Sequence, residues 1–299
     1  MQITQNNPTV SIITPNYNQG QFIRESIESV VNQNYKHLDY IIIDGGSTDQ
    51  SVEIIRKYGD TYPFIRWISE KDHGQADAIN KGFKLAEGNI IAWLNADDAY
   101  LFPSVINDVV DLFQAKPGID AIYGDVLIIN GNNRLMKVQC TPSFHYGRLV
   151  RGCYIKQPAL FFRRKILEEM HLNPRLEYAL DYEFWLRMGK SYKLIHQPRL
   201  WAVDRNHPAR KIISNRDLMS KESRYVANKY TRQRSKLQKL MEWVDYKIHV
   251  GLKSKICGFR KLLKLYNTKE TLSLVLSIEF PRYHKVLWNQ LFGRNENLY

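Results

Sequence analysis

Strand-like and helix-like segments alternate along the first 125 residues of the chain. Runs rich in β-branched residues are followed by segments of about 10–15 residues with apolar positions at helical spacing. The expected strands are 10–14, 40–43, 64–68, 90–94 and 121–123. The expected helices are 22–33, 47–58, 75–86 and 103–114, the second starting at a capping box of Ser47 and Gln50. Because such crossovers join parallel strands, the pattern predicts an α/β fold with a mostly parallel sheet flanked by helices.

The pattern changes after residue 125. Segments 126–129 and 135–138 flank Asn130-Gly131 and predict a β-hairpin. Segment 154–162 reads as extended, and 181–190 reads as a helix with acidic residues in its first turn. From residue 215 the sequence is helical in pattern and rich in Lys and Arg. We therefore expect two parts, an α/β domain over 1–210 and a basic helical extension over 211–299.

The positive charge of the chain is concentrated in its last third. The 299 residues carry a net charge of +13, of which 1–204 contribute −1 and 205–299 contribute +14. Such asymmetry favours an anionic partner. Cations and large apolar residues interleave over 253–266, which is typical of helices on an anionic membrane surface. The alternative is a helical cap packed on the body, and nucleic acid is not expected because no binding motif accompanies the charge.

Other features restrict the class of protein. The N-terminal MQITQNNPTV lacks the pattern of a signal peptide, and no uncharged apolar run reaches the ~18 residues of a spanning helix. The longest candidate, 271–278, is too short. Cys140, Cys153 and Cys257 lie far apart and form no metal-spaced pair. We expect reduced thiols and a cytoplasmic location, peripheral on the inner face of the membrane.

Polar clusters follow three of the expected strands: residues 15–18, 44–46 and 95–98. Ligands bind at the carboxyl ends of parallel strands, so these clusters predict one site. Asp97 and Asp98 are adjacent carboxylates that repel unless a cation neutralises them. Oxygen ligands favour Mg²⁺ or Mn²⁺, which commonly completes its shell with substrate phosphates. The alternative is a solvated turn in which Asp98 caps the next helix.

Two residues of the other clusters suit a nucleotide. Asp44 can accept a hydrogen bond from a base or ribose, or else close an Asx turn with Gly45-Gly46. Tyr17 can stack on a base or simply pack in its loop. The chain has neither of the usual Gly-rich phosphate-binding motifs. Phosphate neutralisation would therefore come from a metal and from scattered basic groups.

Three segments in order carry a family resemblance: VSIITPNYNQGQFIRESIESVVNQNY, YIIIDGGSTDQSVEII and EKDHGQADAINKGFKLAEGNIIAWLNADD. They resemble family-2 inverting glycosyltransferases of the GT-A fold, most closely the bacterial branch that builds O-antigen and capsule repeat units. The resemblance spans 8–205 and is strongest over 8–125. It implies a Rossmann-like GT-A domain.

The resemblance also implies roles for individual residues. The residues expected to bind the nucleotide and donor sugar are Thr14, Pro15, Tyr17, Asp44, Asp72, Gln75, Asp77, Asn80, Asn95 and Asp97. Asn95 stands where the family's Asp-x-Asp motif has its first Asp, so Asp97 and Asp98 are expected to supply the metal and ribose contacts. Arg205 and His207 resemble an Arg-x-His element near the diphosphate, with His207 as a further metal-ligand candidate. Gln157 falls in what resembles the acceptor-side segment.

The expected catalytic residue is Asp181. The string Leu180-Asp181-Tyr182-Glu183-Phe184-Trp185 resembles the helix start that carries the family's general base, although Leu180 and Glu183 depart from the pattern. A helix N-cap role for Asp181 is compatible with this one. The resemblance thus implies inverting transfer from a nucleotide-diphosphate sugar, with a UDP-sugar favoured, to a lipid-diphosphate-linked saccharide.

Two other functions are alternatives to sugar transfer. Nucleotidyl transfer would call for a Gly/Arg-rich phosphate loop after the first strand, where this chain has Pro-Asn-Tyr-Asn-Gln-Gly. A non-catalytic sugar-nucleotide-binding or assembly-partner protein would keep the fold and lose the chemistry. The presence of Asp44, Asp97, Asp98 and Asp181 disfavours that loss.

Overall fold

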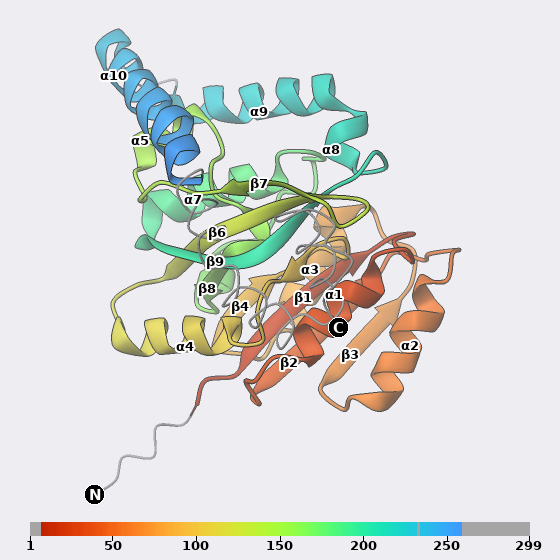
Figure 1. The fold of residues 1–299 in the computed structure, drawn as a ribbon. Helices are drawn as coiled ribbons and strands as arrows, with labels where there is room; N and C mark the ends of the chain where they lie inside the picture. The colour runs from red at the N-terminus through yellow and green to blue at the C-terminus, as the bar shows by residue number, and fades with distance from the viewer. Residues whose placement is uncertain (1–6, 232–233, 259–299) are drawn as a thin grey trace, which may run out of the picture.

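The computed structural model describes residues 7–231 and 234–258, which form one sheet covered by helices on both faces (Figure 1). The nine strands run in the order β3-β2-β1-β4-β8-β6-β9-β5, and β7 pairs with β6. Six strands share one direction, and β5, β7 and β8 run against it. The strands are β1 (Val10–Asn16), β2 (Leu38–Asp44), β3 (Ile65–Ser69), β4 (Ile90–Trp93), β5 (Ala99–Tyr100), β6 (Ala121–Asn130), β7 (Leu135–Gln139), β8 (Leu160–Arg163) and β9 (Leu194–Asn206).

The helices divide between the two faces of the sheet. Apolar residues of α1, α2 and α4 join one core cluster, and those of α3, α5 and α7 join the other. The helical bounds are α1 (Ile23–Val31), α2 (Ser51–Thr61), α3 (Gln75–Leu85), α4 (Val105–Ala115), α5 (Tyr146–Arg151), η1 (Gln157–Ala159), α6 (Ile166–Glu169), α7 (Leu180–Ser191), α8 (Lys211–Ser214), α9 (Arg216–Thr231), α10 (Lys236–Tyr246) and the π-helix η2 (Lys247–Lys253).

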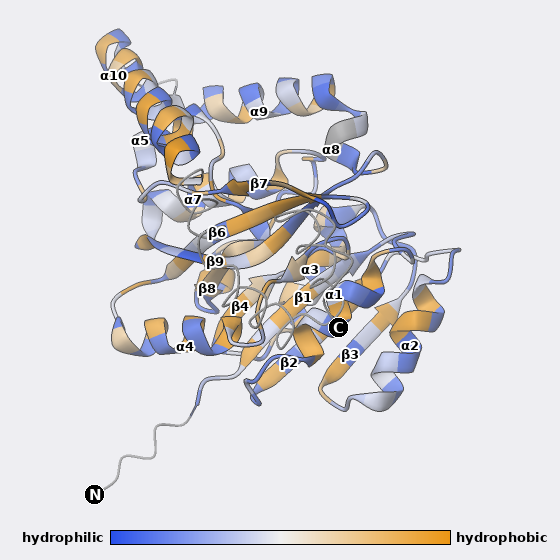
Figure 2. Cartoon of the chain, viewed as in Figure 1, coloured by the Kyte–Doolittle hydropathy of each residue, from blue (hydrophilic) through white to orange (hydrophobic). Residues whose placement is uncertain are grey.

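The central strands are apolar on both faces. Ile12 and Ile42 pack on the side of α1, while Ile13 and Ile43 pack on the side of α3, as expected for strands whose side chains alternate. A strand that is buried on both faces has a continuous run of apolar residues, so these strands could be predicted from the sequence. In Figure 2 the ribbon of β6 is largely hydrophobic in colour, whereas hydrophobic and hydrophilic segments alternate along α2 and α9.

The predicted α/β fold is confirmed, with the expected strands and helices in place and a β6–β7 hairpin after residue 125. The capping box of Ser47 and Gln50 is wrong. The α2 helix begins at Ser51, and the Ser47 hydroxyl instead donates to Asp44 at 2.5 Å, because the buried carboxylate needs partners. The short elements β5, α5, η1 and α6 were not expected.

The described part of the basic extension lies on the body. Arg148 of α5 donates two hydrogen bonds to Asp245 of α10, at 2.6 and 3.0 Å, and Arg151 donates to Glu242 at 3.0 Å. No helix of the described ranges is long and apolar enough to cross a membrane. Most of segment 253–266 and all of 271–278, both singled out in the sequence, lie outside the described residues.

Candidate functional site

Polar side chains from four places in the chain meet where β4 ends. They come from the turn after β4, from η1, from the end of β9 and from the start of α3. Asn95 links three of these places. Its Oδ1 accepts from Gln75 at 3.0 Å and from Trp93 at 2.7 Å, and its Nδ2 donates to Gln157 at 2.9 Å. An aspartate could accept the first two bonds but could not donate the third. Asn95, which departs from the family motif, thus connects Gln75 with Gln157. These residues belong to the segments expected on the donor side and on the acceptor side.

Asp97 and Asp98 point to different partners. Oδ2 of Asp97 lies 3.1 Å from Nε2 of His207, whose ring also packs against Phe22 with centroids 4.5 Å apart. Asp98 is 1% exposed, and its Oδ1 accepts the backbone N–H of Arg205 at 2.9 Å. Burial raises the pKa of Asp98 well above its ordinary range, and the charge of Asp97 raises it further. The pair therefore places two neighbouring carboxyl groups at the end of β4.

Arg205 does not offer a free cation to a diphosphate. Its side chain is 1% exposed, and its Nε donates to the Asp97 carbonyl at 2.9 Å while Nη2 donates to Glu25 at 2.5 Å. Nη1 donates to Asn133, and the guanidinium lies 5.0 Å from the Phe22 ring centroid. The sequence resemblance suggested a phosphate contact. The geometry instead makes Arg205 an internal link that fixes the 97–98 turn.

A second basic group lies nearby and was missed in the sequence. Arg210, just past β9, pairs with Asp204, and Lys156 lies 3.6 Å from the other oxygen of that carboxylate. Burial would raise the pKa of Asp204, but Arg210 and Lys156 outweigh it and lower the pKa. The charges of Asp98 and Asp97 act on Arg210 as well. Arg210 is thus the basic side chain that borders the carboxylate pair, and only its proximity in space, not its place in the sequence, reveals this.

Asp181 lies in the first turn of α7, half-buried. Its Oδ1 accepts the backbone N–H of Tyr182 at 2.7 Å. Burial raises the pKa of Asp181, and the charges of Lys156 and Arg210 oppose the rise. Arg210 therefore lies within electrostatic range of both Asp181 and the carboxylate pair. A raised pKa makes a carboxylate a stronger base, which suits a group that accepts a proton in catalysis.

Asp44 closes the loop after β2. It is fully buried and accepts five hydrogen bonds: from Asn16, from the Ser47 hydroxyl and amide, from Gly46 and from Ser69, at 2.5–3.1 Å. Burial alone would raise its pKa, yet the Ser47, Ser69 and Asn16 bonds lower it. The structure thus displays the Asx-turn role, and the contact with a base stays a prediction.

Tyr17 is placed differently. It directly follows β1 and is 62% exposed, so its ring is open to a stacking partner.

Asp72 and Asp77, both predicted to bind the donor, make hydrogen bonds within the loop before α3. Asp72 accepts the Gly74 amide at 2.9 Å and lies against Gly45, where an added Cβ would stand 2.6 Å from an Asp72 oxygen. Asp77 accepts the His73 amide at 3.1 Å, and Lys81 lies 3.4 Å away. Both residues therefore order the loop before α3.

Three predicted residues are turned into the body. Thr14 is fully buried with its hydroxyl 3.1 Å from Tyr40, and Pro15 is buried in β1. Asn80 exchanges two 2.9 Å hydrogen bonds with the backbone of Leu172. Those bonds clamp α3 to the segment before α7. The side chains of Thr14 and Asn80 are therefore occupied by the fold rather than presented to a ligand.

The donor set suits a hard divalent cation. Within residues 7–231 and 234–258, no three His, Cys, Asp or Glu side chains converge as a ready-made metal site. Asp97 and Asp98 offer carboxylate oxygens. Burial, and after it the charge of Asp97, raises the pKa of Asp98, so a bound cation would favour its ionised form. These residues fit an ion held by one or two carboxylates that completes its shell with water and phosphate oxygens.

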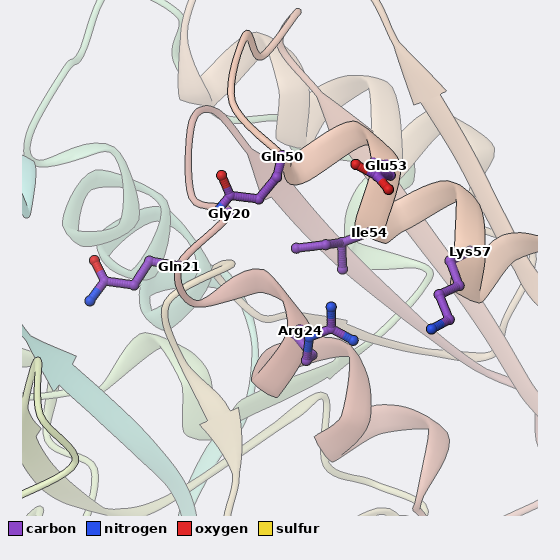
Figure 3. Close-up of a pocket in the computed structure, with 7 residues that line it drawn as sticks. All are labelled: Gly20, Gln21, Arg24, Gln50, Glu53, Ile54 and Lys57. Atoms are coloured by element: carbon purple, nitrogen blue, oxygen red, sulfur yellow. The ribbon is translucent and has the colours of Figure 1, made fainter.

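A separate surface hollow lies between α1 and the start of α2 (Figure 3). Its lining includes Gly20, Arg24, Gln50, Glu53 and Lys57. None of the residues predicted for the site lines it. The chemistry-bearing residues are thus at the strand ends and not in this hollow.

The chain is similar in sequence to known glycosyltransferases. It is 28% identical over 217 residues to an uncharacterised glycosyltransferase of Rickettsia prowazekii, covering 68% of this chain and 65% of that protein. It is 28% identical over 226 residues to a chondroitin synthase of Pasteurella multocida, covering 74% of this chain and 23% of the synthase. The chain thus spans less than two thirds of the length of either relative.

Solved structures share its fold. Residues 1–349 of TarS from S. aureus, in complex with UDP-GlcNAc, superpose with a TM-score of 0.62 at 17% identity, over 93% of this chain and 84% of that one. The mannosyltransferase PcManGT from Pyrobaculum calidifontis, in complex with GDP-Man and Mn²⁺, gives 0.60 at 18% identity, over 96% and 85%. The fold is therefore GT-A-like. A family model described as Glycosyl transferase family 2 matches residues 11–170, more than half of the chain, and the chain belongs to that family.

Proposed function

We propose that this protein is an inverting glycosyltransferase that moves a sugar from a nucleoside-diphosphate sugar to a lipid-diphosphate-linked saccharide. The observation that carries the proposal is the convergence of two acidic centres on Arg210. Arg210 pairs with Asp204, and the charges of Asp204, Asp98 and Asp97 outweigh the effect of burial and raise its pKa. The charge of Arg210 in turn opposes the rise that burial causes in the pKa of Asp181. A site for a charged leaving group thus adjoins a candidate base. Family membership and the sugar-nucleotide complexes of TarS and PcManGT support this assignment.

The proposed chemistry is one displacement at the anomeric carbon. Asp181 accepts the proton of the acceptor hydroxyl while that oxygen attacks, and the nucleoside diphosphate leaves. Arg210 and Lys156 offset part of the charge on the departing phosphate. Asp97 and Asp98 would hold Mn²⁺ or Mg²⁺, which supplies further charge stabilisation to the diphosphate. Tyr17 stacks on the base, with a UDP-sugar as the favoured donor.

The acceptor proposal rests on the basic extension. Leu237, Leu240, Met241, Val244 and Ile248 follow helical spacing along α10 and η2, and each is 40–68% exposed. Figure 2 shows hydrophobic colour along α10 at the margin of the molecule. Lysines flank this stripe at 236, 239, 247 and 253. An apolar stripe bordered by cations suits an anionic membrane, where a lipid-linked acceptor of O-antigen or capsule type would lie.

Vesicle flotation tests the membrane part of the proposal. Full-length protein should float with anionic vesicles at low salt and less at high salt, and Leu240→Ser with Met241→Ser should weaken the binding. Tyr225→Ser, which removes an exposed aromatic of α9, is the matched control. Equal flotation of neutral and anionic vesicles, or none, would remove this part.

A transfer assay tests the reaction itself. Purified protein is incubated with UDP- or GDP-sugars and a lipid extract from a polysaccharide-producing bacterium, and the lipid fraction is analysed by mass spectrometry. A product heavier by one sugar, with inverted anomeric configuration by NMR, is expected. Nucleotide-sugar binding without transfer to any acceptor would favour a non-catalytic sugar-nucleotide-binding protein on the same fold.

A further inference from the structure

Glu222 of α9 holds the turn that leads into α7. Its Oε1 accepts the backbone N–H of Glu177 at 2.8 Å. Its Oε2 accepts those of Tyr178 at 2.5 Å and Ala179 at 3.0 Å. One carboxylate thus binds three consecutive amides that lie 43–45 positions away in the sequence.

The α7 helix has no cap of its own. Its N-cap residue is Ala179, which makes no side-chain capping bond. The amides at a helix start lack intrahelical partners, and alanine is a poor residue at this position. A carboxylate there makes charge-assisted hydrogen bonds and faces the positive end of the helix dipole. Glu222 therefore supplies the cap from a different helix.

The capped turn immediately precedes Asp181. Only Leu180 separates Ala179 from Asp181 in the sequence, so a shift of the turn moves the carboxylate. On its other side the turn meets the donor-side loop, because a Cβ added at Gly74 would lie 3.9 Å from a Glu177 oxygen. Lys211 pairs with Glu177 and lies 5.6 Å from the Tyr178 ring centroid. The turn is thus held between α9 and the donor side of the site.

We propose that Glu222 is a positioning residue for the transfer reaction, holding the 177–179 turn so that Asp181 keeps its place in the site. This inference rests on the proposed function of Asp181 as the base. It gives α9, at the start of the basic extension, a part in catalysis without any contact to substrate.

The first test measures the turn itself. Amide hydrogen exchange of the full chain is followed by mass spectrometry in the wild type, Glu222→Gln, Glu222→Ala and Asp217→Asn. Asp217 is an exposed carboxylate on the same helix, so its variant matches the change of charge. Exchange over 177–182 should rise in Glu222→Ala, rise less in Glu222→Gln, which keeps one accepting oxygen, and stay unchanged in Asp217→Asn. Unchanged exchange in Glu222→Ala would overturn the proposal whether or not the protein is a transferase.

The second test measures turnover once a donor and an acceptor are in hand. Glu222→Ala should lower kcat by about tenfold or more with the donor KM within about twofold, since a small displacement of a catalytic group is costly. Glu222→Gln should recover part of the rate. Tyr230→Phe removes a hydrogen bond between α9 and α7, from the Tyr230 hydroxyl to Glu183 at 3.0 Å, and should cost less.

The two tests separate their failures. An equal loss in Glu222→Ala, Tyr230→Phe and Asp217→Asn would assign Glu222 a general role in stability and overturn the positioning role. A wild type without transfer activity would count against the proposed function, and the exchange data would still decide whether Glu222 orders the turn.

Discussion

Asn95 donates a hydrogen bond to Gln157 at 2.9 Å and so joins the end of β4 to the start of η1. The same side chain accepts from Gln75, which begins α3. The Asn95 side chain thus connects three segments: the start of α3, the turn after β4 and η1. In the proposed transfer these segments would serve the donor, the metal and the acceptor. In this structure the Asn95 side chain therefore links these segments through its hydrogen bonds.

Changing Asn95 to Asp should therefore destabilise the protein. The new carboxylate cannot donate to Gln157 and adds a third negative charge beside Asp97 and Asp98. We expect a loss of about 1–3 kcal/mol in the free energy of unfolding, measured by chemical denaturation. Asn173→Asp is the control, because Asn173 uses only its Oδ1, as an acceptor for Arg175. Equal effects of the two variants would contradict the role assigned to Asn95.

Replacing Asp181 with Asn should abolish transfer and spare binding. The amide keeps the size of the side chain but cannot take a proton, so kcat should fall by about 10²–10⁴-fold. Nucleotide affinity, measured by calorimetry, should stay near that of the wild type. Asp217→Asn again controls for the lost charge. Turnover in Asp181→Asn at a rate close to wild type would show that another group is the base.

The dependence of transfer on pH follows from the environment of Asp181. Burial raises the pKa of this carboxyl above its ordinary value of 3.8. The base is active only when ionised, so kcat/KM should fall as the pH is lowered toward the raised pKa, at a higher pH than for an exposed aspartate. The measurement is a kcat/KM profile from neutral to acidic pH, with circular dichroism to confirm folding. An acid limb at or below 3.8 would contradict the buried-base assignment.

Substitutions of Arg205 and Arg210 should have different effects, the first mainly on stability and the second mainly on nucleotide binding. Arg205→Met breaks the buried links to Glu25 and Asp97 and should cost about 2 kcal/mol of stability. Arg210→Met leaves Lys156 beside Asp204, so the fold should be less affected. It should instead weaken nucleoside-diphosphate binding by about tenfold, the worth of one charge-assisted contact. The reverse pattern, in denaturation and calorimetry, would place the phosphate contact at Arg205.

The fold could be predicted because short segments of the sequence show which residues form strands and which form helices. Ile12, Ile13, Ile42 and Ile43 belong to runs that are apolar on both faces, and the helices between them show one apolar stripe. The start of α2 could not be placed correctly, because Ser47 is used by Asp44 rather than by the helix. The Ser47 hydroxyl donates to the buried carboxylate of Asp44, and it is therefore not available to cap the helix as the local pattern predicted.

The site was predictable only in part. Asp97, Asp98 and Asp181 were predicted because they follow a strand or match a family motif, and their roles stay predictions. The roles of Arg205 and Arg210 were not, since Arg205 meets Glu25 across 180 positions and Arg210 meets the carboxylates only through the end of β9. Glu222 gives no sequence signal at all, because its partners are backbone amides.

Binding of nucleotides tests the central claim most directly. The melting temperature of the full chain would be measured with UDP, GDP, UDP-GlcNAc and GDP-mannose, each with Mn²⁺ and with EDTA. A rise in Tm for one nucleotide series that requires Mn²⁺, and that is lost in Asp98→Asn shown to be folded, is the predicted result. No shift with any nucleotide in folded wild-type protein would contradict the account of this site as the centre of a nucleotide-sugar glycosyltransferase.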